Sequence, residues 1–411
     1  MYLTSVTQRD RLFQLVLRWF ADRPEPDDGK FITQVFLYEN VIWAPTLRRF
    51  VLDILTRVEP GPIHTQRLRT KDELRAILSS SFDSLGPRSR ELFEKYRMYP
   101  EEFFPGTPAD VVLARRENGR PVGMVRVKRL KRIAEKASRR VADFLAGRIR
   151  QAAQENAAAR AAASGVPLEG LISSPEVMFD DFARAERVVS RTFLEEPVRF
   201  QPRDLRLDDV IGIKFVGSEE ELLRIERAIT DHPLVVGQER EEHRGKYNDI
   251  NLLVDLELPL PEEILRSTRL QDWSKGEKRG LSPELLSREF PAYVHSGART
   301  VRAEVILTTG EDLIESEFGR AIHEQRILEQ RTSAPYSGRI AGNASFLIEY
   351  LLMLAISPKT RLGEIPIKMW GRYLPDIYSL AVWDLFDIRL GLEVEQAFSN
   401  RTYTPPEEPT R

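Results

Sequence analysis

The stretch RLDDVIGIKFVG, residues 206–217, sets two carboxylates directly before an apolar run and is the clearest signal of the fold. β-Branched and aromatic residues in such a run are typical of a buried strand, and Asp209 stands at its entrance. A second run, TVRAEVILTTG at 300–310, places Glu304 inside another apolar strand. A buried carboxylate costs free energy unless it is paired or binds a metal. If the two strands are neighbours, Asp209 and Glu304 could therefore share a cation.

The composition excludes several classes of protein. The chain has 411 residues, 42% of them hydrophobic and 30% charged, which is typical of a soluble globular protein. Because 61 basic residues balance 63 acidic ones, any basic surface must be local. The absence of cysteine excludes disulfides, thiolate metal sites and a cysteine nucleophile. The five histidines are scattered singly, so no histidine metal cluster is expected.

Neither the N-terminus nor the most apolar segment has the pattern of a membrane segment. The N-terminal stretch carries Arg9, Asp10 and Arg11 within its apolar pattern, which indicates an amphipathic helix and not a signal peptide. The most apolar segment, 344–357, is shorter than the roughly 20 residues of a membrane span and contains Glu349. We expect a cytoplasmic protein without membrane contact, in which 344–357 is a buried helix.

Turn signals and apolar periodicity divide the chain into regions. We expect a helical N-terminal region at 1–105, a mixed α+β domain at 106–331, a helical C-terminal region at 335–400 and a tail at 401–411. The mixed domain would carry a helical insertion around 140–205 and a loop insertion around 259–299. The aromatics of the C-terminal helices could belong to the core or form a contact between copies of the chain.

The mixed domain is predicted to contain a sheet of about five strands. Two strands flank the turn at 117–120, and the others are expected at 209–216, 247–258 and 300–309. A helix should follow at 218–230, because Ser218 and Glu221 have the spacing of a capping box.

The densest basic stretch, GMVRVKRLKRIAEKASRR at 123–140, has two interpretations. Arg126 and Lys128 are two residues apart in a strand and share one face, and the following helix continues with further basic residues. These residues could form a solvated helix face. They could instead clamp phosphates, because Arg and Lys at fixed offsets suit polyphosphate oxygens.

The carboxylates also allow more than one interpretation. Asp209 and Glu304 could bind Mg²⁺ together with substrate phosphates, or Glu304 could lie on an exposed face beside Arg302. In the strand VDLEL, Asp255 and Glu257 share one face. That pattern would suit the two-metal site of a polymerase-β-like nucleotidyltransferase, or it could be the solvent face of an edge strand.

Several segments, taken in order between about 120 and 330, resemble the synthetase domain of the RelA/SpoT family of (p)ppGpp-making pyrophosphotransferases. RVKRLKRIAEK resembles the family's R-x-K pair and the basic helix after it, with Arg126, Lys128, Ile133 and Lys136 in register. DVIGIK is similar to the family's D-[IL]-x-G-I-R strand and keeps Asp209 and Gly212, with Lys214 in place of Arg.

The remaining segments resemble the family with substitutions. KYNDIN is similar to G-Y-x-x-I-H, keeping Tyr247 and Ile250 and placing Asn251 where the family has His. EVILTT keeps Glu304 of E-V-Q-I-R-T, with Thr308 in place of Arg. SEFGRAIHEQR, at 316–326, resembles a segment of the long family members.

The resemblance implies a fold and an activity. The fold would be nucleotidyltransferase-like, and the reaction would be Mg²⁺-dependent transfer of pyrophosphate from ATP to the ribose 3′-oxygen of a guanine nucleotide, as in alarmone synthesis. A toxic or tRNA-directed variant, or a nucleotide-binding regulatory module without activity, would also fit the substitutions. The family's hydrolase domain would need metal-binding His residues and a His-Asp pair, which the scattered histidines do not supply, so we expect no hydrolase domain.

The resemblance also implies roles for single residues. Asp209 and Glu304 would bind Mg²⁺, and Glu304 would help to deprotonate the attacking hydroxyl. The remaining residues would bind substrate, those of the basic stretch through the phosphates of ATP: Arg126, Lys128, Lys136, Lys214, Arg244, Lys246, Tyr247 and Asn251. Within this set, Tyr247 would stack on the acceptor base, and Arg244 or Lys246 would hold the acceptor phosphates.

Overall fold

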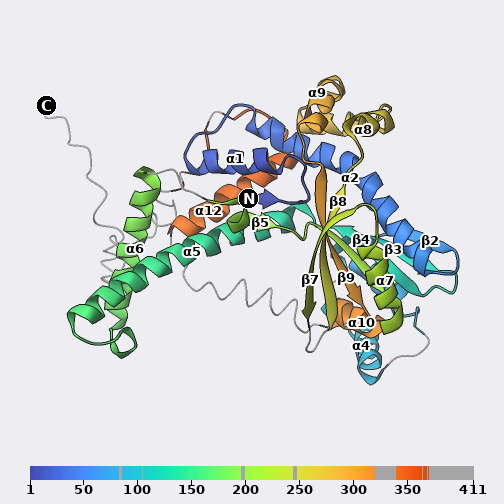
Figure 1. Cartoon of the computed structure of the whole chain (residues 1–411), viewed down its shortest axis with the longest axis horizontal. Coiled ribbons are helices and arrows are strands. Elements are labelled where there is room, and N and C mark those ends of the chain that lie inside the picture. Colours follow the sequence, from blue (N-terminus) through green and yellow to red (C-terminus); the bar gives the residue numbers. More distant parts are fainter. Residues whose placement is uncertain are drawn as a thin grey trace.

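The structure, a computed structural model of the chain, describes residues 1–82, 86–103, 105–195, 200–243, 248–319, 339–362, 364–367 and 369, with the backbone alone at 192–195. It has an α+β fold around one mixed sheet (Figure 1). The α+β class and the mixed sheet are confirmed. The predicted number of strands is wrong, because the sheet has seven strands instead of about five.

The sheet places strands from distant parts of the sequence side by side. Its order is β2 (Ile63–Thr70), β3 (Pro108–Arg116), β4 (Pro121–Val127), β6 (Ile211–Val216), β9 (Thr300–Thr308), β8 (Asp249–Glu257) and β7 (Val235–His243). Within this sheet, β6 and β9 pair in parallel and the other neighbours pair antiparallel. The strand that follows Asp209, β6, and the strand that holds Glu304, β9, are therefore direct neighbours.

The two strands that the sequence did not predict, β2 and β7, form the edges of the sheet. β2 has the sequence IHTQRLRT, in which Leu68 alone is buried. β7 has the sequence VVGQEREEH and is exposed over most of its length. Edge strands are commonly polar and charged, which protects them from pairing with other chains. They therefore lack the apolar pattern on which strand prediction depends.

The central strands bury one face in the main core. Ile211, Ile213 and Phe215 of β6 pack there with the alternate residues of β9 and β8. The long helix α2 (Asp28–Val58) and helix α7 (Glu219–Thr230) contribute to the same core. The capping box at Ser218 and Glu221 is confirmed at the start of α7.

The opposite face of the sheet is covered only in part. A second cluster joins this face to α3 (Lys71–Leu78), α4 (Pro87–Met98) and α10 (Gly310–Phe318). This cluster contains Met124 of β4 and Val216 of β6. Beyond it, the same face carries the polar residues of the candidate site.

The remaining helices extend the molecule away from the sheet. Helix α5 (Leu130–Ala163) begins beside β4 and runs outward, and α6 (Pro175–Glu195) packs against its far half (Figure 1). Helix α1 (Arg9–Phe20) belongs to the main core. The segment 259–299 carries α8 (Pro261–Ser267) and α9 (Pro283–His295).

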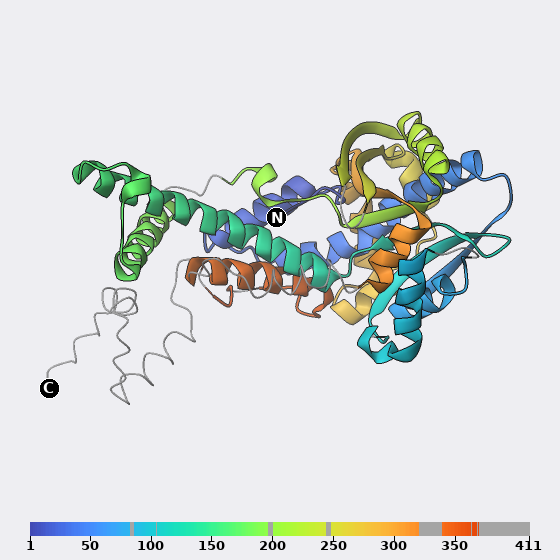
Figure 2. The ribbon, with the colours of Figure 1, turned by 90° about the horizontal axis from the view of Figure 1, so that it is seen from below.

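Helix α12 (Arg339–Met353) lies beside α5 (Figure 2). The segment Arg339–Ile356 is long and apolar enough to cross a membrane by composition alone, but 56% of it is buried inside the protein. Its burial agrees with the expectation of a core helix in 344–357. Most of the predicted C-terminal region and the tail at 401–411 lie outside the described residues, so an oligomeric contact through these helices stays a prediction.

Candidate functional site

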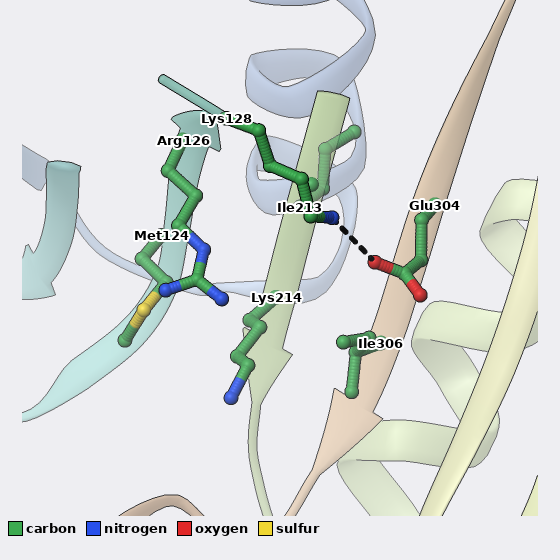
Figure 3. A pocket seen from close by; sticks show the side chains of 8 residues that line it. Met124, Arg126, Lys128, Ile213, Lys214, Glu304 and Ile306 are labelled. Atoms are coloured by element: carbon green, nitrogen blue, oxygen red, sulfur yellow. Dashed lines mark ion pairs between the residues drawn. The ribbon is translucent and has the colours of Figure 1, made fainter. Parts of the chain in front are cut away.

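The site is built on register rows that cross the central strands. Arg126 of β4 lies opposite Gly212 of β6, and Gly212 lies opposite Glu304 of β9. In the next row, Lys214 lies between Met124 and Ile306. Gly212 has no side chain, so Arg126 and Glu304 flank an open space. With Lys128 and Ile213, these rows line a small pocket whose empty volume, including the solvent at its mouth, is about 330 Å³ (Figure 3).

The two carboxylates named by the sequence analysis converge at one end of this pocket. The Lys128 ammonium lies 3.0 Å from Oδ2 of Asp209 and 3.9 Å from Oε2 of Glu304. Lys136, from the second turn of α5, also donates to Oδ2 of Asp209. Two carboxylates, one from the segment just before β6 and one from β9, thus lie beside one cation, which in this structure is an ammonium group. We call this part of the site the carboxylate end.

The charges at the carboxylate end keep Asp209 ionised. Burial alone would raise the pKa of Asp209, but Lys128 and Lys136 outweigh burial and hold the pKa below its usual value. Burial lowers the pKa of Lys128, and Asp209 partly offsets that effect. The side chains of Asp209 and Glu304 are about one-fifth exposed, so a ligand can reach both.

Asn251 of β8 supports Glu304. Its Nδ2 donates to Oε1 of Glu304 at 3.2 Å, and its Oδ1 is buried without a hydrogen-bond partner in the described part of the chain. The hydroxyl of Thr308, at the end of β9, is buried and equally without such a partner there. Both residues stand where the sequence departs from the RelA/SpoT pattern, and both leave a buried polar atom unsatisfied.

The other end of the pocket is formed by Lys214 and residues of α10. Lys214 is buried and donates to Oγ of Ser316 at 3.1 Å. Glu317, the next residue, is buried and pairs with Lys71 of α3 at 3.0 Å. Burial lowers the pKa of Lys214, with Glu317 acting in the opposite direction. We call this part of the site the Lys214 end.

The structure brings together most of the residues that the sequence analysis named. They are Arg126, Lys128, Lys136, Asp209, Lys214, Asn251 and Glu304, contributed by β4, α5, β6, β8, β9 and the segments beside β4 and β6. Arg244, Lys246 and Tyr247 lie outside the described residues. The predicted acceptor side of the site is therefore described only through Asn251 and Lys214.

The alternative sites are not assembled in the same way. Arg302 lies two residues before Glu304 on the same partly exposed face of β9, but its guanidinium pairs with both carboxylate oxygens of Asp255, at 2.8 and 2.6 Å. Glu257, two residues further along β8, is exposed. Asp208 turns away from Asp209 and accepts hydrogen bonds from Thr4 and Arg206.

Two members of the site, Lys71 and Ser316, were missed by the sequence analysis. Lys71 lies in the N-terminal region, far in sequence from the motif segments, and nothing in its neighbourhood suggests a role. Ser316 lies next to Glu317, an acid inside the apolar pattern DLIESEF of α10. A buried acid requires a cationic partner, and that requirement could have pointed to this cluster.

The carboxylate end fits a hard divalent cation only in part. Mg²⁺ is commonly bound by one or two carboxylates, with phosphate oxygens and water completing the shell, and Asp209 and Glu304 supply two carboxylates. Among the described residues, no group of three or more histidine, cysteine or acidic side chains could hold a metal. The fit therefore requires that a substrate provide the remaining ligands and that the Lys128 ammonium move aside.

Comparisons with known proteins add no relative. No protein-family model matches the chain, and neither does any curated protein or solved structure with which it was compared. Inference about function therefore depends on the site itself and on the motif resemblance.

Proposed function

We propose that the protein transfers pyrophosphate from ATP to the 3′-hydroxyl of a guanine nucleotide in a Mg²⁺-dependent reaction. The observation that carries this proposal is the convergence of Asp209 and Glu304 on one cation beside the basic residues of β4 and α5. The motif resemblance supplies the identity of the donor and of the acceptor. The nucleotidyltransferase-like topology is part of the same proposal.

In this reaction the acceptor oxygen attacks the β-phosphorus of ATP. The bond between that phosphorus and the oxygen bridging to the α-phosphorus breaks, and AMP leaves with the bridging oxygen. Glu304 accepts the proton of the attacking hydroxyl. Mg²⁺, held by Asp209 and Glu304, would neutralise phosphate charge when bound.

The basic residues of the site position the donor. Arg126, Lys128 and Lys136 would bind the ATP phosphates, and Lys128 would exchange its carboxylate partners for phosphate oxygens. Phosphoryl transfer depends mainly on such positioning and on stabilisation of charge, so no protein nucleophile is needed.

The Lys128 contacts favour a second candidate, a nucleotide-binding module without chemistry. In such a module, Lys128 would remain between Asp209 and Glu304 and no metal would bind. The polymerase-β-like alternative has less support, because Asp255 is neutralised by the double contact with Arg302. A tRNA acceptor is a variant of the leading proposal.

The test is to incubate the purified protein with ATP, Mg²⁺ and GDP or GTP, and to measure AMP together with a guanosine tetra- or pentaphosphate. We expect both products from the wild type. Asp209→Asn and Glu304→Gln should lower their formation by roughly 10²-fold or more. Asp180→Asn, a matched change at an exposed site on α6, should have no effect.

The other outcomes separate the candidates. ATP binding without AMP formation would favour the module without chemistry. AMP formed only when tRNA is present would identify the tRNA-directed variant. Release of inorganic pyrophosphate with transfer of the nucleotidyl group would contradict the proposal and support the polymerase-β-like alternative.

A further inference from the structure

The two ends of the pocket differ in their balance of charge. At the carboxylate end, the cations Lys128 and Lys136 face two carboxylates, Asp209 and Glu304, so opposite charges are matched. At the Lys214 end, the charged groups are Arg126, Lys71, Lys214 and two acids, Glu317 and Asp249. Three cations there face two carboxylates.

The surplus of positive charge faces the pocket. Arg126 and Lys214 both line the pocket, and their charged groups extend into the same space (Figure 3). The guanidinium of Arg126 forms no hydrogen bond or ion pair with the residues that the structure describes, and Lys214 donates to the neutral hydroxyl of Ser316. The remaining acid near Lys214, Asp249, accepts a contact from His243 at 2.8 Å. Cations buried without sufficient counter-charge favour binding of an anion.

Glu317 and Lys71 are placed to control Lys214. Glu317 is 3% exposed and has the largest electrostatic effect of any charged group on the Lys214 ammonium. Lys71 fixes Glu317 from the opposite side, at 3.0 Å. Neither side chain lines the pocket, so both would act on a ligand through Lys214.

We propose that the Lys214 end is a separate subsite for a phosphoryl group, bound by Lys214 and Arg126, with Glu317 and Lys71 as positioning residues that keep the Lys214 ammonium in place. A planar guanidinium and an ammonium aimed at one space suit the oxygens of a dianionic phosphate. Under the proposed function, which this last step requires, Lys214 holds a phosphate of the acceptor nucleotide and Arg126 lies between that phosphate and the phosphates of ATP. The binding of a simple anion does not depend on that function.

The subsite can be tested with simple anions on the full chain, without ATP and with EDTA present. Isothermal titration with sulfate and with inorganic phosphate, at constant ionic strength, should show one site in the wild type. Lys214→Met should weaken both anions by about tenfold or more, because a charge-assisted hydrogen bond is lost. Lys278→Met, a matched change of an exposed lysine in the segment 259–299, should leave the affinities unchanged.

The pH profile of sulfate binding tests the positioning residues. Sulfate keeps its charge across the neutral and alkaline range, so loss of binding with rising pH reports the deprotonation of the protein. The charged groups facing Lys214 are Arg126, Lys71, Glu317 and Asp249. Glu317→Gln removes a carboxylate near Lys214 and should shift the pH midpoint downward. Lys71→Met removes a like charge and should shift it upward.

These results distinguish the subsite from a merely structural cluster. A structural role would change the stability of the variants without moving the two midpoints in opposite directions. The proposal is overturned if Lys214→Met binds sulfate as the wild type does, or if neither midpoint moves. Because no nucleotide or metal is present, failure of pyrophosphate transfer would leave this outcome unaffected.

Discussion

Replacement of Glu317 by Gln should destabilise the fold in a way that depends on pH. Burial alone would raise the pKa of Glu317, but Lys71, Lys214 and Arg126 lower it from 4.5 to about 2. One pKa unit corresponds to about 1.4 kcal/mol, so the ionised carboxylate stabilises the folded state by about 3 kcal/mol at pH 7. A folded protein typically has about 5–15 kcal/mol of stability, so the variant should still fold.

The direction of the pH dependence follows from the lowered pKa. The contribution of Glu317 is complete above its unfolded pKa of 4.5 and is lost as the pH falls toward about 2. At pH 3 it should have fallen to about 1.4 kcal/mol. The difference in unfolding free energy between wild type and Glu317→Gln should therefore shrink between pH 5 and pH 3, since Glu317 then takes up a proton in the unfolded wild type while it stays ionised in the folded one.

Urea denaturation of both proteins at several pH values measures this difference. Glu315→Gln is the matched control on the same helix, because Glu315 pairs with Arg88, whose side chain is 53% exposed. Because Arg88 is more than half exposed, solvent screens this pair, and its removal should cost less than removal of the buried Glu317. A Glu317→Gln penalty below about 1 kcal/mol at pH 7, or one that does not change with pH, would refute the reasoning.

Further predictions concern the pocket and the buried ion pairs. Gly212→Val should abolish nucleotide binding while the protein stays folded. The fold should tolerate the change because a Cβ at Gly212 would meet nothing closer than 3.8 Å, at the Arg126 carbonyl oxygen. Calorimetry measures the binding and circular dichroism the folding, and binding with wild-type affinity would contradict the site. Arg116→Ala should lower the free energy of unfolding by about 3–5 kcal/mol, because the Glu59 side chain, 2% exposed, loses its guanidinium partner. Urea denaturation measures this free energy, and a decrease below about 1 kcal/mol would show that Glu59 is solvated. Burial raises the pKa of Glu39, so the stability from its neutral form is complete below the unfolded pKa and is lost as the pH rises through the folded pKa. Glu39→Gln should remove that decline with pH in thermal unfolding, and an unchanged profile would contradict this origin.

The sequence predicted the centre of the fold better than its edges. The strands β6 and β9 were recognised because each carries an unbroken apolar face, and burial of that face determines the strand. The edge strand β7 was missed because its side chains are mostly charged. Edge strands form through backbone hydrogen bonds to a neighbour, and the side-chain pattern does not record those bonds.

The order of the motifs along the chain predicted which residues form the candidate site, but it did not predict the contacts between them. Asp209 and Glu304 were named together, and the structure places them around one cation. The sequence did not show that this cation is the Lys128 ammonium, because Lys128 follows the last residue of β4 and its long side chain could reach several partners. Lys71 was out of reach of any local pattern, since it meets Glu317 only through packing of α3 against α10.

The position of β9 has a consequence for the newly synthesised chain. This strand is made after β6 and β8, yet it lies between them in the sheet. Until it emerges from the ribosome, β6 and β8 each present an unpaired edge, and the site lacks one of its two acids. Strand pairings over such long separations form slowly. Nascent chains that stop before residue 300 should therefore be prone to aggregate and unable to bind substrate, so synthesis itself delays the onset of any activity.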